Sequence, residues 1–118
     1  RFIAAEESLA SQRYREHVVN CDSDDVMLTS AFTGLPASWL RPAVLAAGLD
    51  PQSLDEQVTP EISNAVYGGG NDAAGPRRWT DVVSAGHSVS GVSAIEPASH
   101  IIDRIAREFF SANGTPIL

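Results

Sequence analysis

The segment near the end of the 118-residue chain constrains the fold most, because its apolar residues follow a helical spacing. These residues recur at i, i+1, i+4 and i+5 and are Ile101, Ile102, Ile105, Ala106, Phe109 and Phe110. The opposite side carries Asp103, Arg104, Arg107 and Glu108. Ser93 and Glu96 have the spacing of a capping box, Pro97 suits a first helical turn, and Asn113-Gly114 suits a stop. The pattern predicts an amphipathic helix over about residues 96–112.

Composition restricts the class of protein and its partners. Hydrophobic residues make up 43% of the chain and charged residues 19%, which is typical of a globular chain of at most one domain. Eight basic residues against fifteen acidic ones give a net charge of −7, which argues against nucleic acid or an anionic lipid surface as partner. The longest apolar stretch is interrupted by Arg41, Pro42 and Gly48, so no transmembrane span is expected.

Cysteine usage points to a reducing compartment. Cys21 is the only cysteine, so the chain can form no internal disulfide, and no Cys/His cluster has the spacing of a metal site. We therefore expect a cytoplasmic protein with no metal ion.

Short elements are predicted in the first half of the chain. The apolar run Phe2–Ala5 predicts a buried strand that ends at the polar residues after it. A helix is expected from Ser8 or Ser11, either of which can cap it, to about Asn20. A second short strand is expected over Val26–Thr29, followed by a turn.

The middle of the chain is rich in helix breakers. Because Pro42 removes a donor, residues 36–48 are predicted to form two short helical pieces that stop at Gly48. Leu54, Val58, Ile62 and Val66 have i, i+4 spacing, although Pro60 interrupts the series. One or two helical turns are expected there, followed by a mobile loop at Gly68–Asn71.

Residues 79–91 are small and almost uncharged, which is typical of a segment that lies against another surface. The sequence from Gly86 to Ser90 is similar to a G-x-S-x-G nucleophile turn, but the second glycine comes one residue late, so a tight turn is favoured over a hydrolase. His87 lies within this segment, where a neutral imidazole can contact a ligand or simply satisfy a structural hydrogen bond.

Five stretches in order resemble the C-terminal third of the nitronate monooxygenase family, also called 2-nitropropane dioxygenase. Residues 1–8 (RFIAAEES) resemble the family's R-F-L-x-x-x-E-S without its leading Gly-Thr, and residues 14–16 (YRE) resemble Y-K-E. Residues 28–37 (LTSAFTGLPA) resemble T-R-A-F-T-G-R-P-A, and residues 79–87 (WTDVVSAGH) resemble W-x-D-x-W-S-A-G-Q. The closing amphipathic helix completes the match.

The resemblance implies an α/β fold, the C-terminal fragment of a TIM (β/α)8 barrel flavoenzyme. In that case residues 1–5 hold the last barrel strand, about 22–76 form a substrate-side insertion, 79–91 form the flavin-facing turn, and about 96–112 form the closing helix. A barrel needs about 250 residues, so the start at Arg1 is expected to be a break just after the family's phosphate-binding Gly-Thr.

The resemblance also implies the cofactor and its contacts. FMN is the expected cofactor, with Ser84, Ala85, Gly86 and His87 as the retained flavin contacts and with Arg1 and Phe2 beside its phosphate site. The catalytic base is expected upstream of this chain. The 118 residues alone are expected to be inactive and marginally stable, since Phe2, Ile3 and the closing helix would lack the barrel that covers them.

Substrate and partners stay open at this point. His87 replaces the family's Gln, and Ser30 and Leu35 replace basic positions. The first expectation is oxidation of a small-molecule nitronate with O2 through reduced flavin. The alternatives are a related NAD(P)H-dependent flavin reductase or enoyl reductase, with NAD(P)H as a further partner, and a non-catalytic helical module that binds through residues 35–67.

Overall fold

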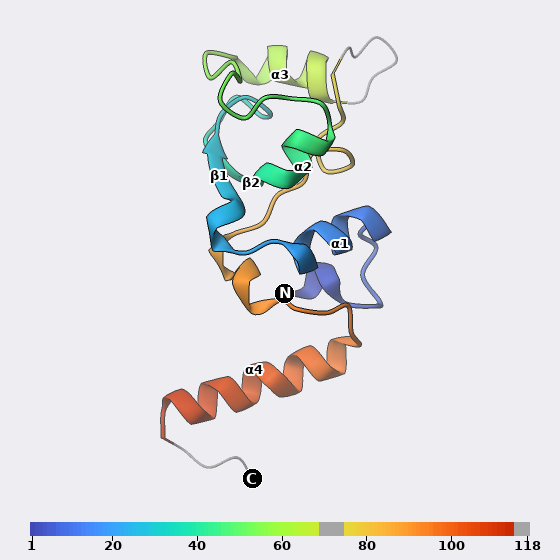
Figure 1. Ribbon diagram of the computed structural model, residues 1–118, viewed down its shortest axis with the longest axis vertical. Coiled ribbons are helices and arrows are strands. Elements are labelled where there is room, and N and C mark those ends of the chain that lie inside the picture. The colour runs from blue at the N-terminus through green and yellow to red at the C-terminus, as the bar shows by residue number, and fades with distance from the viewer. Residues whose placement is uncertain (69–74, 115–118) are drawn as a thin grey trace.

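A computed structural model describes residues 1–68 and 75–114 of the chain. The molecule is elongated, with principal extents of 55 × 25 × 21 Å. Figure 1 shows three tiers along the long axis. Helices α2 (Arg41–Ala46) and α3 (Pro60–Tyr67) lie with strands β1 (Val26–Thr29) and β2 (Ala37–Leu40) in the first, α1 (Gln12–Asn20) lies in the second, and α4 (Ala98–Ala112) projects as the third.

The N-terminal segment differs from the expected strand. Phe2–Ala4 form a 3-10 helix, η1, in which the amide of Ala4 donates to the carbonyl of Arg1. The only β-contact here is a single parallel bridge between Ala5 and Glu96. A strand needs a neighbouring ladder for its backbone groups, and one bridge does not supply it, so the chain satisfies these groups locally. The prediction of a strand over residues 1–5 is therefore wrong for this structure.

Helix α1 confirms the predicted helix and one of its two candidate caps. The Ser11 hydroxyl accepts the amide of Tyr14 at 3.1 Å, as an N-cap does, and the helix ends at Asn20. Val18 is buried on the inner side. The Ser8 hydroxyl instead accepts the amide of Ala10 before the helix begins.

The two strands form an antiparallel hairpin of which only β1 was expected. Val26 pairs with Leu40 and Thr29 with Ala37, so the segment predicted to be the first of two helical pieces is strand β2. Pairing with β1 and burial of both Trp39 and Leu40 outweigh the weak helical signal there.

Proline positions explain the two helices that follow. Pro42 lies in the first turn of α2, where its missing N–H has no intrahelical acceptor to lose. Gly48 follows α2 with φ 84°, which confirms the predicted stop. Pro60 likewise begins α3 rather than interrupting it, with the Thr59 hydroxyl accepting the amide of Ile62. The loop expected at Gly68–Asn71 lies, from residue 69 on, outside the described residues.

The core consists of two small clusters that meet at two extended segments. Leu40 and Val83 belong to the cluster around α1 and η3 (His87–Gly91), whereas Trp39 and Val82 belong to the cluster around Phe32 and α2. Successive side chains of an extended chain point to opposite sides, so each segment contributes to both clusters. The amide of Leu40 donates to the carbonyl of Val83 at 3.0 Å and joins them.

Helix α4 confirms the predicted closing helix, but its start is held differently from the predicted capping box. The Glu7 carboxylate accepts the amide of Ala98 at 3.0 and 3.1 Å, while Glu96 forms an ion pair with Arg104. Gly114 follows the helix with φ 66°. Glu96 is thus used in the ion pair, and the carboxylate at the start of α4 comes from a residue distant in sequence.

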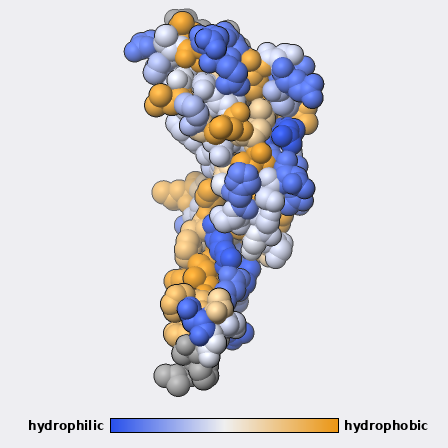
Figure 2. Space-filling model, turned by 90° about the vertical axis from the view of Figure 1, so that its left-hand side faces the viewer, coloured by the Kyte–Doolittle hydropathy of each residue, from blue (hydrophilic) through white to orange (hydrophobic). Residues whose placement is uncertain are grey.

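The apolar face of α4 is mostly uncovered. Ile101 is buried, but Ile102, Ile105 and Phe109 are exposed. Figure 2 shows hydrophobic side chains gathered along this projecting end of the molecule. Over the described ranges 1–68 and 75–114, no helix combines the length and the hydropathy that a membrane crossing requires.

Candidate functional site

The turn at Ser84–Gly86 is anchored by the buried residues before it. Val82 and Val83 are fully buried, one in each core cluster, so the chain leaves the core at a fixed place. The turn then leads into η3, where the amide of Val89 donates to the carbonyl of Gly86 at 3.0 Å. The sequence expectation that this uncharged segment lies against another surface is confirmed for its valines.

The turn forms one wall of an open groove of about 390 Å³. The facing walls come from elements distant in sequence: Tyr14 of α1, Ser38 and Trp39 of β2, and Trp79. The volume lies in the lower part of the range of about 300–1,000 Å³ that is typical of small-molecule sites. Ser84, Ala85 and Gly86, all predicted as flavin contacts, therefore lie together in a hollow of suitable size.

Tyr14 fixes the conformation of the turn. Its hydroxyl donates to the carbonyl oxygen of Ser84 at 2.5 Å and lies 3.4 Å from the Ser84 Oγ. The bond joins helix α1 to a turn 70 residues away. A buried or half-buried bond of this kind contributes about 1 kcal/mol and, more importantly here, sets the direction of the Ser84 carbonyl.

Trp79 is the strained residue of the groove. Its φ is 61°, and among the described residues no other non-glycine residue has a positive φ. A bulky side chain in this region costs about 1–3 kcal/mol and persists only where surrounding contacts hold it. Its ring lies 5.8 Å from that of Trp39 and its centroid lies 5.3 Å from the Arg78 guanidinium carbon, yet 52% of the residue is exposed.

Trp39 carries an unusual buried donor. The residue is 1% exposed and lines the groove, but its Nε1 has no hydrogen-bond partner in the described part of the chain. An unsatisfied buried donor costs about 1–3 kcal/mol. The groove thus contains one tryptophan with a strained backbone, Trp79, and one with an unsatisfied indole N–H, Trp39.

The remaining predicted contacts do not join the groove. His87 begins η3, is exposed, and does not line the hollow. Phe2 is 49% exposed, and its neighbour Ile3 contacts the groove instead. Arg1 lies in a separate small hollow beside Gly91, with its guanidinium 2.7 Å from the Glu108 carboxylate.

These positions fit the ring of a flavin but not its phosphate. A Cβ built on Gly86 would meet no atom within 4 Å, so a flat ligand can approach the backbone there. The Ser84 hydroxyl supplies a polar group at the same wall. Arg1, the one cation predicted near the phosphate, is neutralised by Glu108.

Among the groove residues that the sequence did not indicate are its three aromatic residues, Tyr14, Trp39 and Trp79. Trp79 begins the stretch that resembles the family motif, so its place in the motif was a usable signal. Tyr14 likewise begins the stretch 14–16 that resembles the family, whereas Trp39 reaches the groove only through the packing of β2, which no local spacing in the sequence indicates.

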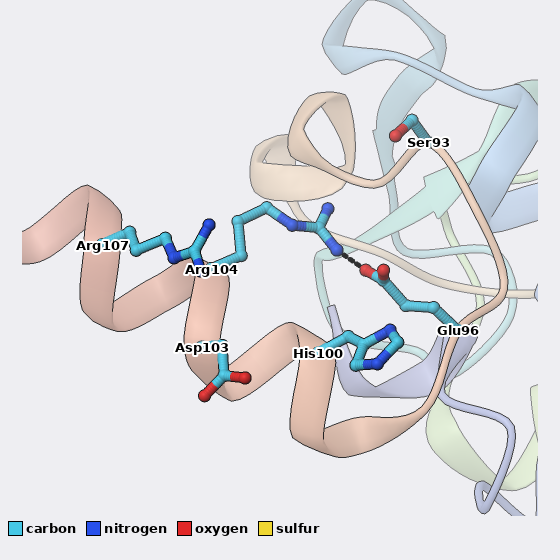
Figure 3. A pocket seen from close by; sticks show the side chains of 6 residues that line it. All are labelled: Ser93, Glu96, His100, Asp103, Arg104 and Arg107. Carbon is cyan, nitrogen blue, oxygen red and sulfur yellow. Dashed lines mark ion pairs between the residues drawn. The ribbon is translucent and has the colours of Figure 1, made fainter.

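A larger hollow of about 540 Å³ lies between α4 and the loop before it. Figure 3 shows Arg104 reaching toward Glu96, with His100 beside this pair and Asp103 pointing away from it. Arg104, one of the two arginines that line this hollow, is therefore already paired with Glu96. This hollow shares no residue with the Ser84–Gly86 turn that the family resemblance indicates, so we assign the candidate site to the groove.

Comparisons with known proteins find similarity to solved structures, but none to a family model or a curated protein. No family model matches the chain, and no curated protein matches it. Solved structures do match, and two of them are of FabK from Thermotoga maritima. One is 27% identical with a TM-score of 0.56, and the other, a variant with one substitution, is 25% identical with a TM-score of 0.59. The chain is covered over 97% but spans only 36% and 32% of those two chains.

Proposed function

We propose that this chain is the flavin-facing C-terminal portion of an FMN-dependent oxidoreductase with a TIM-barrel fold. The observation that carries the proposal is the groove in which the Ser84–Gly86 turn meets Tyr14 and Trp79. The similarity to FabK over nearly the whole chain supports the same conclusion.

Each groove residue has a role in this proposal. When bound, FMN supplies the hydride and electron chemistry. Ser84 binds a polar edge of the ring through its hydroxyl, and Gly86 allows the ring to approach the backbone. Tyr14 is a positioning residue, because it holds the Ser84 carbonyl. Trp79 and Trp39 exclude water from the same side.

The substrate within this class is proposed on the family resemblance, which favours a nitronate oxidised with O2. An enoyl reductase fits the similarity to FabK equally well, and an NAD(P)H-dependent flavin reductase is a further alternative. These activities differ in their reductant: a nitronate reduces the flavin itself, whereas the reductases need NAD(P)H.

The test uses protein that contains this chain together with the rest of the barrel. We expect it to purify yellow or to bind added FMN. Anaerobic mixing with an alkyl nitronate, and separately with NADH or NADPH, then shows which compound bleaches the flavin absorbance. Bleaching by NAD(P)H alone would replace the nitronate assignment with a reductase.

A colourless protein that ignores FMN would overturn the proposal. The remaining function would then be that of an interaction module using residues 35–67, where Leu35, Leu45 and Ile62 are exposed. A chain that retains a binding partner, and loses that partner when these three residues are mutated, would be identified as an interaction module.

A further inference from the structure

We infer that Trp79 is the stacking residue for a planar nitrogen heterocycle that enters the groove. The isoalloxazine of a flavin and the ring of a nicotinamide share this chemistry. The identity of the ring rests on the proposed function, whereas the role of Trp79 rests on the geometry below.

The backbone around Trp79 holds the indole in a conformation that it would not adopt alone. The Trp79 amide donates to the Val82 carbonyl at 2.5 Å, and the Asp81 amide donates to the Arg77 carbonyl at 2.7 Å. The Asp81 carboxylate accepts the Arg77 amide at 2.8 Å. A tight loop closed by these bonds fixes a positive φ at a residue with a large side chain, and such outliers cluster at ligand sites.

Arg78 and Trp39 restrain the Trp79 ring itself. The Arg78 guanidinium lies over the ring and also donates to the Phe32 carbonyl at 3.0 Å and to the Asn64 Oδ1 at 2.6 Å. It is therefore tied to two other elements. Trp39 packs beside the same ring at a tilt of 35°. A restrained aromatic ring loses little conformational entropy when a second ring stacks on it.

The rest of the groove complements a heterocycle better than a plain hydrocarbon. Trp79 lines the groove and is 52% exposed. Ser84 also lines the groove, and its hydroxyl can donate to a ring nitrogen or carbonyl oxygen, whereas Tyr14 and Thr33 already donate their hydroxyl protons to the carbonyls of Ser84 and Leu35. The volume of about 390 Å³ suits one ring system rather than an extended dinucleotide.

The experiment follows the two indole N–H signals of the 15N-labelled chain, which come from Trp39 and Trp79. Trp79→Phe removes one signal and so assigns both. Titration with riboflavin, and separately with nicotinamide mononucleotide, should shift the Trp79 signal in a saturable way. Trp79→Phe should bind within a factor of about three of the parent, and Trp79→Ala should bind at least tenfold more weakly.

Ile62→Ala is the matched control, because Ile62 is also 52% exposed but lies on α3 outside the groove. It should bind like the parent chain. Far-UV circular dichroism checks that each variant is folded. If Trp79→Ala does not fold, the shift of the Trp79 signal in the parent chain decides the question.

The outcomes separate this inference from the proposed function. Saturable flavin binding that leaves the Trp79 signal and the Trp79→Ala affinity unchanged overturns the inference but not the flavin assignment. A Trp79 response to nicotinamide but not to flavin supports the inference and contradicts the FMN assignment. A folded chain whose Trp79 signal responds to neither ring overturns the inference.

Discussion

At the scale of single residues, three glycines differ in what a methyl group would meet. A Cβ on Gly34 would lie 2.5 Å from the Pro60 nitrogen, and its φ is 83°. Gly48 has φ 84° but open space around it, and Gly86 has open space and a negative φ. A side chain at Gly34 would therefore meet both a steric clash and a strained backbone. At Gly48 it would meet the strained backbone alone, and at Gly86 it would meet neither.

We predict that alanine lowers the free energy of unfolding most at Gly34, less at Gly48 and least at Gly86. Gly48→Ala should cost about 1 kcal/mol, because only the left-handed backbone is disfavoured. Gly34→Ala should cost more, and Gly86→Ala should cost almost nothing. Urea unfolding measures all three. If Gly86→Ala is as destabilising as Gly34→Ala, the space beside Gly86 in the groove is not open. If Gly86→Ala is stable yet binds riboflavin less tightly, the ligand contacts the backbone at Gly86.

Cys21 gives a pH-dependent prediction. Burial, followed by the charges of Asp25 and Asp22, raises the pKa of its thiol from 9.0 to about 11. Because the folded chain disfavours the thiolate, the stability that this group contributes is complete below pH 9 and is lost as pH rises toward 11. The difference in unfolding free energy between Cys21→Ala and the parent should be constant below pH 9. Above pH 9 the parent should lose stability relative to Cys21→Ala, because only the parent has the thiol.

Reaction with a disulfide reagent checks the same thiol directly. At pH 8 the folded chain should react far more slowly than the chain in urea. The burial of Cys21, at 6% exposure, and its raised pKa both act in this direction. Equal rates in the folded and unfolded states would contradict the burial of Cys21.

Local residue roles could be read from the sequence, and distant ones could not. Ser11 as a cap and Gly48 as a stop follow from residue type and neighbours alone. The bond from Tyr14 to Ser84 and the positive φ of Trp79 arise from tertiary packing, which overrides the ordinary preferences of these residues. Half of the predicted flavin contacts were therefore found together, while the opposite wall was missed.

At the scale of elements, α4 depends on a cap supplied by another part of the chain. Its N-cap residue, Pro97, has no side-chain hydrogen bond to offer, and the Glu7 carboxylate takes the amide of Ala98. A negative charge at a helix N-terminus also interacts favourably with the helix dipole. Glu7 thus links the N-terminal segment to the start of the last helix.

Glu7→Ala should destabilise the chain by about 1 kcal/mol and fray the first turn of α4. Glu7→Gln keeps one acceptor without the charge and should lie between the parent and Glu7→Ala. Glu6→Ala is the matched control. The Glu6 carboxylate is next to Glu7 in sequence and is exposed, but it has no described hydrogen-bond partner. Hydrogen exchange of the amides at residues 98–100 measures the fraying; equal protection in Glu7→Ala and Glu6→Ala would contradict the cap.

Elements were predictable where the pattern was long or capped. The apolar spacing of α4 placed that helix within two residues, and α1 was predicted with the correct end at Asn20 but with its cap left open between Ser8 and Ser11. Of the four-residue segments only Val26–Thr29 was assigned correctly: Phe2–Ala5 lacks a partner strand, and Ala37–Leu40 gains one in β1. Pairing is a property of the whole chain, which is why these two assignments were exchanged.

At the scale of the whole molecule, the chain is less compact than its length suggests. Its radius of gyration is 16.6 Å, against about 13.5 Å for a compact chain of this length. Its accessible surface is 7122 Å², against about 6,200 Å² expected from its mass. The excess goes with the projecting α4, whose residues Ile102, Ile105 and Phe109 are exposed (Figure 1).

The apolar face of α4 is predicted to be covered in a complete barrel, of which the chain spans about a third by comparison with FabK. In the 118-residue chain, Ile102→Glu and Phe109→Glu should leave stability nearly unchanged and reduce self-association, because they replace exposed apolar surface by charge. In protein that contains the rest of the barrel, the same changes should each cost about 2–4 kcal/mol, because a charge would be buried there.

The opposite responses in the two proteins make the prediction specific to burial. Arg107→Glu, a change on the polar face of the same helix, should have little effect on the stability of either protein. Thermal unfolding and sedimentation of both proteins, each with all three variants, provide the measurements. If Phe109→Glu is tolerated equally in the short chain and in the longer protein, this face is not where the barrel packs.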